Sequence, residues 1–97
     1  MQDNYYHINS KSNLCDALAG MVDPDEVSNF LQDILTIEEL REVKRRFAVA
    51  GLLEEGMTYR EISKMMGIST ATITKIKYML QCGKGGYNMA LSQLKTI

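Results

Sequence analysis

Apolar residues recur every three or four positions along most of the chain, which is the spacing of amphipathic helices. The first such stripe lies in residues 13–21 and consists of Leu14, Ala17, Leu18 and Met21. A second helix is predicted to begin at Asp23-Pro24, because Asp is a good N-cap and Pro suits the first helical position. We expect this helix to bury one face, made of Val27, Phe30, Leu31 and Ile34. No segment alternates with the period of a strand, so the pattern predicts an all-α fold.

The longest predicted helix runs from Ile37 to Glu55. Thr36 and Glu39 have the spacing of a capping box before it, and Gly56 follows it as a stop. Gly51 lies inside this helix, where glycine costs about 1 kcal/mol relative to alanine. We therefore expect a close backbone contact at that position. The apolar positions of the helix are Leu40, Val43, Phe47, Val49, Ala50, Leu52 and Leu53.

A basic run occupies the middle of the same helix, at Arg41, Lys44, Arg45 and Arg46. Two interpretations of it are open. The cations can form a solvated face paired with Glu38 and Glu42, since such pairs form at helical spacing. They can also contact phosphate or another anion.

Residues 58–81 predict two short helices joined by a tight turn. Thr58 and Glu61 again have capping-box spacing, and the first helix runs from Tyr59 to Met66. Gly67 can adopt the left-handed conformation that ends a helix. The second helix continues to about residue 81, and its cap is one of two hydroxyl residues, Ser69 or Thr70.

The two faces of this hairpin differ in composition. The inward positions are apolar: Ile62, Met66, Ile68, Ile73 and Ile76. Ser63 and Ala71 are small where the helices are expected to cross. The outward positions of the second helix are Thr70, Thr74, Lys75 and Tyr78, with Ser69 and Lys77 at the edges. Any αα-hairpin needs an apolar face, but hydroxyls, cations and an aromatic on the other face favour a DNA-binding helix-turn-helix whose second helix reads the major groove.

Charge is distributed unevenly along the 97 residues, although the net charge is only −1. Residues 1–57 hold five Lys or Arg and eleven Asp or Glu, a net of −6, whereas residues 58–97 hold six cations and one acid, a net of +5. No acid follows Glu61. A solvated lysine face would have the same composition, but together with the hairpin the asymmetry favours nucleic acid as the partner.

Composition and spacing argue against several other classes of protein. No apolar run approaches the length of a membrane helix, and no signal-peptide pattern opens the chain, so we expect a cytoplasmic protein. Cys15 and Cys82 lack metal-ligand spacing and are expected to be unpaired thiols. His7 is the single histidine, and no nucleophile is paired with a base, so we expect no enzyme.

The domain organisation is expected to be simple. We expect residues 1–12 to form a flexible arm and residues 13–97 to form a single helical domain. The glycine-rich segment 82–86 lacks the length and the Ser or Thr of a P-loop, so we interpret it as a helix stop and a loop. The last segment, Tyr87 to Ile97, is predicted to form a weak final helix or a tail.

The segments ISTATITK (68–75) and GKGGY (83–87) resemble the Trp repressor superfamily, in particular its YerC/YecD branch. The resemblance extends over about residues 13–87. It implies a Trp repressor-like fold of five to six helices, an intertwined homodimer, and sequence-specific binding of double-stranded DNA by a transcriptional regulator, most simply a repressor. Together with the hairpin it assigns DNA contact to Arg60, Lys64, Ser69, Thr70, Ala71, Thr74, Lys75, Lys77 and Tyr78.

The resemblance also implies a pocket for a small-molecule corepressor between the long helix and the second helix of the hairpin. Its residues would be Thr36, Arg46, Thr72 and Lys75. Lys75 stands where the Trp repressor has a second arginine, and Met79 stands where it has a serine. Lysine lacks the planar fork that holds a carboxylate with two hydrogen bonds. These departures weigh against tryptophan and leave another small ligand, or none, open.

A helical protein-interaction module without DNA binding is the alternative function. Seven methionines could form an adaptable packing surface, and the acidic N-terminal half could bind a basic partner.

Overall fold

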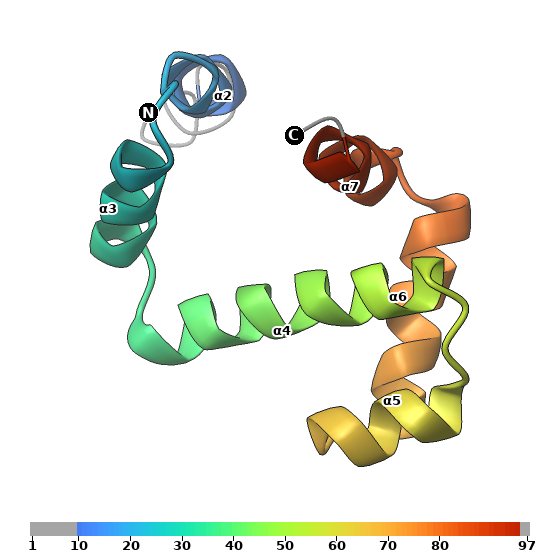
Figure 1. The fold of residues 1–97 in the computed structure, drawn as a ribbon. Helices are drawn as coiled ribbons and strands as arrows, with labels where there is room; N and C mark the ends of the chain where they lie inside the picture. Colours follow the sequence, from blue (N-terminus) through green and yellow to red (C-terminus); the bar gives the residue numbers. More distant parts are fainter. Residues whose placement is uncertain (1–9, 96–97) are drawn as a thin grey trace, which may run out of the picture. The chain divides into compact units, whose positions relative to one another are not determined.

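The computed structural model describes residues 10–95, which form six helices and no strand (Figure 1). The all-α prediction is confirmed. The chain divides into two compact units at Leu40 and Arg41. The first holds α2 (Ser10–Ala19), α3 (Pro24–Ile34) and the start of α4 (Ile37–Glu54). The second holds the rest of α4 and three further helices, α5 (Tyr59–Met66), α6 (Thr70–Cys82) and α7 (Gly86–Lys95).

Local chemistry sets the bounds of α3 as predicted. The Asp23 carboxylate accepts a hydrogen bond from the Asp25 backbone N–H at 2.9 Å, and Pro24 takes the first position of the helix. Asp25 and Glu26 place negative charge in the first turn, where the positive end of the helix dipole favours it. The helix ends at Ile34, the residue that the pattern indicated.

The apolar face of α3 is not buried within this chain. Val27, Phe30 and Leu31 are half-buried, and Ile34 is 54% exposed. On α2, Leu14 is 45% exposed. The prediction that α3 buries this face is therefore wrong for a single chain, since no residue of the face is fully buried.

The start of α2 also differs from expectation. The helix begins at Ser10, so residues 10–12 are helical rather than part of an arm. Residues 1–9, including His7, lie outside the described residues, and an arm there stays a prediction.

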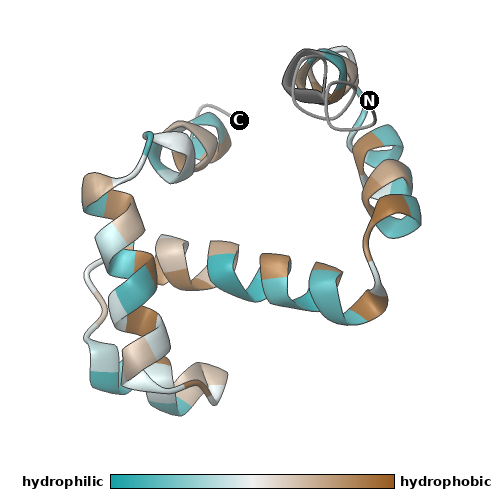
Figure 2. Cartoon of the chain, turned by 180° about the vertical axis from the view of Figure 1, so that it is seen from behind, coloured by the Kyte–Doolittle hydropathy of each residue, from teal (hydrophilic) through white to brown (hydrophobic). Residues whose placement is uncertain are grey.

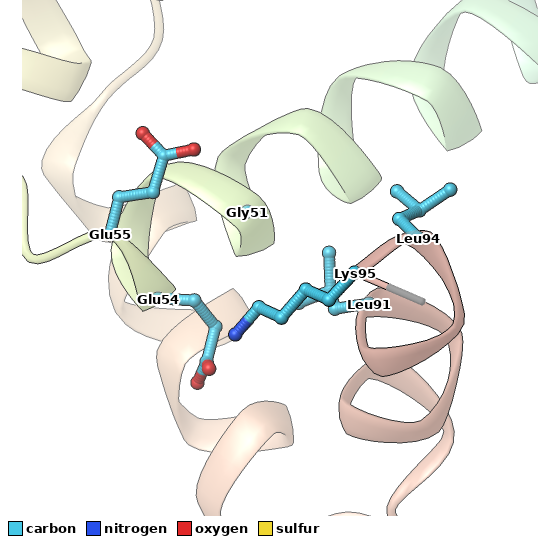
Figure 3. Close-up of a pocket in the computed structure, with 6 residues that line it drawn as sticks. All are labelled: Gly51, Glu54, Glu55, Leu91, Leu94 and Lys95. Atoms are coloured by element: carbon cyan, nitrogen blue, oxygen red, sulfur yellow. The ribbon is translucent and has the colours of Figure 1, made fainter. Parts of the chain in front are cut away.

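Helix α4 forms where predicted and ends one residue earlier, at Glu54. Thr36 and Glu39 form the predicted capping box, with their two hydrogen bonds at 2.9 and 3.1 Å. Apolar and polar segments alternate along the helix (Figure 2). The expected close contact at Gly51 is not found. A Cβ built there would lie 3.7 Å from the Leu91 side chain, an ordinary van der Waals distance, beside a small hollow between α4 and α7 (Figure 3).

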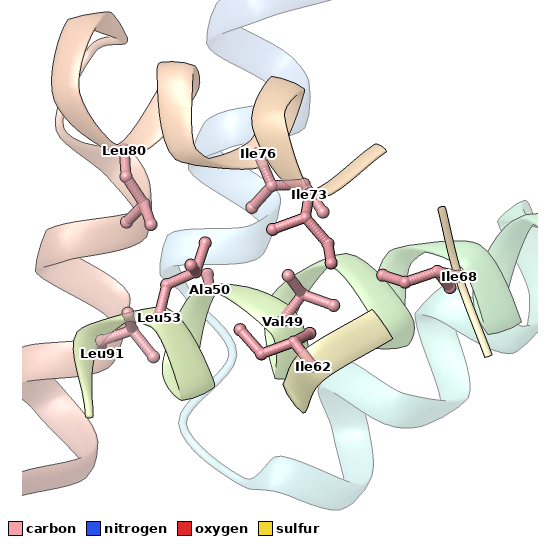
Figure 4. Close-up of a cluster of buried hydrophobic side chains, with 9 residues drawn as sticks. All are labelled: Val49, Ala50, Leu53, Ile62, Ile68, Ile73, Ile76, Leu80 and Leu91. Atoms are coloured by element: carbon pink, nitrogen blue, oxygen red, sulfur yellow. The ribbon is translucent and has the colours of Figure 1, made fainter. Parts of the chain in front are cut away.

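The core of the second unit joins all four of its helices (Figure 4). Val49, Ala50, Ile62 and Ile73 are completely buried. The predicted inward face of the hairpin is confirmed, with Met66 half-buried at the edge of the core. Among the residues that the structure describes, the buried side chains of this core are Val49, Ala50, Leu53, Ile62, Ile68, Ile73, Ile76, Leu80 and Leu91.

Helix α7 contributes to this core, which the sequence did not indicate. The segment was predicted to be a weak helix or a tail, but Leu91 is only 8% exposed and packs with Leu53 and Leu80 in the same cluster. The Asn88 side chain donates a hydrogen bond to the Leu80 carbonyl at 3.2 Å. These contacts link α7 to α6.

Candidate nucleic-acid interface

The hairpin begins with the predicted capping box. The Thr58 backbone N–H donates to the Glu61 carboxylate at 2.9 Å, and the Glu61 N–H donates to the Thr58 hydroxyl at 3.1 Å. These bonds satisfy two backbone donors that the start of α5 would otherwise leave free. Both the backbone and the hydroxyl of Thr58 stabilise the charged carboxylate, and they lower the pKa of Glu61.

The turn between α5 and α6 is held by its own residues. Gly67 has a φ of 67° and a ψ of 36°, the predicted left-handed conformation, and its N–H donates to the Ser63 carbonyl at 2.9 Å. The Ser63 hydroxyl donates to the Ile68 carbonyl. Ser69, rather than Thr70, caps α6, since its side chain accepts from the Thr72 N–H at 3.2 Å. The angle between the two helices is therefore fixed by local bonds as well as by the core.

The outward face of α6 is open to solvent. Tyr78 is 61% exposed, and Thr70, Thr74 and Lys75 are exposed as predicted. Lys77 is half-buried. The other predicted contact residues, Arg60, Lys64, Ser69 and Ala71, are exposed.

Two details qualify the predicted roles of the small and hydroxyl residues. Ala71 is exposed, so its expected place at the helix crossing is wrong, and Ser63 alone fulfils that role. The Thr74 hydroxyl donates to the Thr70 carbonyl at 2.8 Å. It therefore presents an oxygen acceptor and a methyl group outward.

Positive charge on the hairpin is not neutralised within the described part of the chain. Arg60, Lys64, Lys75 and Lys77 form no ion pair there, and Glu61 is held in its capping box. An ion pair does occur in the basic run of α4, where Arg46 and Glu42 lie 3.3 Å apart. If the basic run is a solvated face, its cations should pair with Glu38 and Glu42, and the pair with Glu42 is present.

Of the three predicted small-ligand residues in the second unit, Arg46, Thr72 and Lys75, one lines a hollow beside α6 and α7. Arg46 lines an open hollow of about 490 Å³, whose other walls come from α6, α7 and the segment between them. Lys75 is exposed and Thr72 bonds to Ser69, and neither lines that hollow. Thr36 belongs to the first unit, where it caps α4.

Sequence reasoning missed Lys84 and Tyr87, which line the same hollow. The segment GKGGY contains both residues and could have indicated a binding site. A helix stop and a binding site can have the same glycine-rich composition, so the sequence alone did not distinguish them. Gly83 does end α6, and Gly85 adopts a φ of 82° in the connection to α7.

The part of the chain that the structure describes was also searched for a metal site and for a membrane-spanning helix. No group of three or more His, Cys, Asp or Glu between residues 10 and 95 could hold a metal ion. None of the six described helices is long and apolar enough to cross a membrane.

A capped helix, a left-handed glycine turn and a second helix with an open polar face define a helix-turn-helix protein. Comparison with known proteins agrees. The model of the Trp repressor protein family matches residues 9–95. YerC, an uncharacterized protein of Bacillus subtilis (strain 168), is 38% identical over 82 residues, which are 84% of this chain and 79% of YerC.

Solved structures give the same result. A TrpR like protein from Eubacterium eligens ATCC 27750 superposes with a TM-score of 0.83 and 33% identity, over 97% of each chain. A Staphylococcus aureus protein provisionally described as a Trp repressor has a TM-score of 0.82 and 32% identity, over 98% of this chain and 95% of its own. This chain belongs to the Trp repressor family and is related to YerC. The family is one of regulators rather than enzymes, so membership supports a DNA-binding regulator.

Proposed function

We propose that this protein is a sequence-specific DNA-binding transcriptional regulator that inserts α6 into the major groove. The observation that carries the proposal is the outward face of α6, which is exposed, hydroxyl-rich and cationic on a chain that has no acid after Glu61. An α-helix fits the width of the major groove, where each base pair presents its own pattern of donors, acceptors and methyl groups.

The exposed residues divide into two roles. Arg60, Lys64, Lys75 and Lys77 neutralise phosphates, which supplies affinity and register without sequence information. The residues that approach base edges are Ser69, Thr70, Ala71, Thr74 and Tyr78. Thr74 accepts from a base amino group or contacts the methyl group of thymine, because its own hydroxyl proton is directed to Thr70.

A homodimer is part of the proposal. One short helix reads only a half-site, and two such helices about 34 Å apart match one turn of the duplex. The uncovered apolar positions of α2 and α3 supply a surface that a second copy would bury. We further propose that the regulator acts as a repressor, in line with the description of its Staphylococcus aureus relative.

Lys75→Glu is the decisive variant. It replaces an exposed cation of the reading face with an acid, so DNA binding should fall by two orders of magnitude or more while the circular dichroism spectrum and the melting temperature are retained. Binding is measured by fluorescence anisotropy on a duplex selected from a random pool with the wild-type protein. Lys95→Glu, the same charge change on α7, is the matched control and should bind normally.

Salt dependence tests the same contacts. If the four cations of each of two protomers neutralise phosphates, log K should fall with log salt with a slope of about −7. Normal binding by Lys75→Glu, or a slope near zero, would overturn the assignment. Failure to select any duplex would favour a protein-interaction module instead.

A further inference from the structure

The outward face of α6 carries two small side chains with exposed methyl groups near its N-terminal end. Ala71 and Thr74 are both exposed, although Ile73 between them is completely buried. Because an α-helix turns about 100° per residue, Ala71 lies nearly opposite Ile73, and Ala71 and Thr74 are neighbours on the helix surface. The N-terminal residues of the second helix are those that reach base edges in a helix-turn-helix. Both positions would therefore lie among the first to enter the groove.

The side chains that read guanine or adenine through two hydrogen bonds are absent from this part of α6. Arginine reads guanine in this way, and asparagine or glutamine reads adenine. Residues 70–80 contain no arginine and no amide side chain, and Gln81 is the next-to-last residue of the helix. The two cations, Lys75 and Lys77, are assigned to phosphates in the proposed function. Base discrimination by the start of α6 therefore depends on smaller side chains.

Hydrogen bonds within the hairpin already use several of the hydroxyl groups of α6 and its cap. The Thr74 hydroxyl donates to the Thr70 carbonyl at 2.8 Å, so it has no proton left for a base. The Ser69 and Thr72 hydroxyl oxygens lie 3.1 Å apart in a hydrogen bond, and the Ser69 oxygen also accepts from the Thr72 N–H at 3.2 Å. The methyl groups of this surface are in contrast free to make contacts.

The bond to Thr70 also orients the methyl group of Thr74. Threonine has two preferred rotamers in a helix, because its hydroxyl can bond to a carbonyl of the preceding turn. The hydrogen bond at 2.8 Å restricts the side chain and so sets the direction of its methyl group. A side chain that is held before binding loses less conformational freedom when it is buried at an interface.

We propose that Ala71 and Thr74 read thymine, by packing their methyl groups against the C5 methyl group that thymine presents in the major groove. Alanine and the threonine methyl group both suit this contact. Side chains three residues apart on a helix have Cβ atoms about 5–6 Å apart, and stacked base pairs are about 3.4 Å apart. The two residues would thus reach thymines one or two base pairs apart. This inference rests on the proposed DNA-binding function and names the base that is recognised.

Helix propensity does not explain both residues. A surface alanine is the best helix former, but threonine is a poor one, so Thr74 is not accounted for by the stability of α6. Propensity alone also predicts that neither residue affects the choice of base. The experiment therefore compares two bases, and does not rely on a loss of affinity alone.

The first test replaces thymine by deoxyuridine, which pairs with adenine in the same way and lacks only the C5 methyl group. The wild-type protein selects a duplex from a random pool, and each thymine of the half-site is exchanged in turn, in both half-sites together. At a contacted thymine, binding measured by fluorescence anisotropy should weaken about fifteenfold, from about fourfold for each methyl group in two independent half-sites. Exchange at the other thymines should leave binding unchanged.

Variants assign the effect to the two side chains. Thr74→Ser keeps the hydroxyl and removes the methyl group, so it should bind the thymine and deoxyuridine duplexes equally at one position of the half-site. Ala71→Gly should lose the discrimination at the other position. Thr58→Ser also removes a threonine methyl group, at the cap of α5 and outside the proposed contacts, and should discriminate as the wild type does. Circular dichroism of each variant verifies that the fold is retained.

Three outcomes would contradict the inference in different ways. Equal binding of thymine and deoxyuridine duplexes by the wild type at every position would overturn it and leave the proposed function standing. Discrimination that persists in both Thr74→Ser and Ala71→Gly would also overturn it, because the methyl groups of thymine would then act through the shape of the DNA. Failure to select any duplex would overturn the proposed function and this inference with it, so the two failures are distinguishable.

Discussion

Two glycines of the second unit, Gly51 and Gly67, occupy their positions for different reasons, and the difference can be measured. Gly67 has a φ of 67°, which a residue with a Cβ adopts at a cost of about 1 kcal/mol. Gly51 is helical, and a Cβ there would only touch Leu91 at 3.7 Å. Gly67→Ala should therefore lower the free energy of unfolding by about 1 kcal/mol, and Gly51→Ala should raise it by up to about 1 kcal/mol. Urea unfolding followed by circular dichroism measures both changes, and a destabilised Gly51→Ala would show that the Leu91 side chain lies closer to Gly51 than the structure has it.

Glu61 makes the stability of the hairpin's first helix end depend on pH. Its pKa lies below the ordinary value of 4.5 because the Thr58 backbone and hydroxyl hydrogen-bond to the charged carboxylate. A depressed pKa stabilises the fold above pH 4.5, and this stabilisation is lost as the pH falls through the pKa of the folded state. Glu61→Gln keeps an acceptor for the Thr58 N–H but cannot titrate.

The wild type should melt at a slightly higher temperature than Glu61→Gln near neutral pH, and the gap should close in acid. The effect should be small because the carboxylate is fully exposed to solvent. Melting curves of the two proteins across this pH range provide the measurement. A constant gap would mean that the carboxylate charge does not contribute to the cap.

At the scale of elements, helix α7 is a structural part of the second unit. Leu91 is 8% exposed in the core, whereas Leu94, three residues later on the same helix, is 57% exposed. Leu91→Ala should lower the free energy of unfolding by about 2–4 kcal/mol, and Leu94→Ala should change it by no more than about 0.5 kcal/mol. Chemical denaturation of the two variants makes the comparison. Equal losses would contradict the packing of α7 described here.

The elements that the sequence predicted well are those whose ends are set by neighbouring residues. Thr58 with Glu61, Asp23 before Pro24, and the glycine at position 67 each define a helix end within a few positions. The period of the apolar residues then identified most of the core. The outward face of α6 followed from the same period, because positions that do not face inward on α6 must face outward.

The features that the sequence did not predict depend on distant parts of the chain. Leu91 is buried because it joins the core cluster that includes Leu53 of α4 and Leu80 of α6. The hollow at Arg46 exists because a residue of α4 and the corner after Gly83 come together in space. The exposure of Ile34 is the converse case, since a helical period indicates an apolar face but does not say whether the same chain covers it.

The whole molecule combines an acidic, apolar N-terminal half with a basic C-terminal half. In the proposed complex the acidic half would repel DNA, so this charge asymmetry would favour contact through the hairpin. The same half also carries exposed apolar positions, such as Leu18 at 36% and Ile37 at 74% exposure. A dimer through this half would separate its two tasks, with association at one end of the sequence and DNA contact at the other.

Leu18→Asp tests the association. An aspartate within the apolar stripe of α2 should convert the proposed dimer into monomers and abolish binding to a two-half-site duplex, because a buried unpaired charge is costly. Light scattering after size-exclusion chromatography gives the mass. Asn13→Asp, an exposed polar position on the same helix, adds the same charge and should stay dimeric. A wild-type protein with the mass of one chain would contradict the dimer.

The hairpin is held in shape by one group of positions, and its outer surface is formed by another. Ser63, Gly67 and Ile68 fix the turn, and Ile62 and Ile73 anchor it, while Thr70, Thr74 and Tyr78 have no part in the core. If α6 reads DNA as proposed, new operator preferences could therefore arise during evolution by exchange of the outer residues with little loss of stability. Paralogues that recognise different promoters could share this hairpin unchanged in its interior and differ in three or four surface residues.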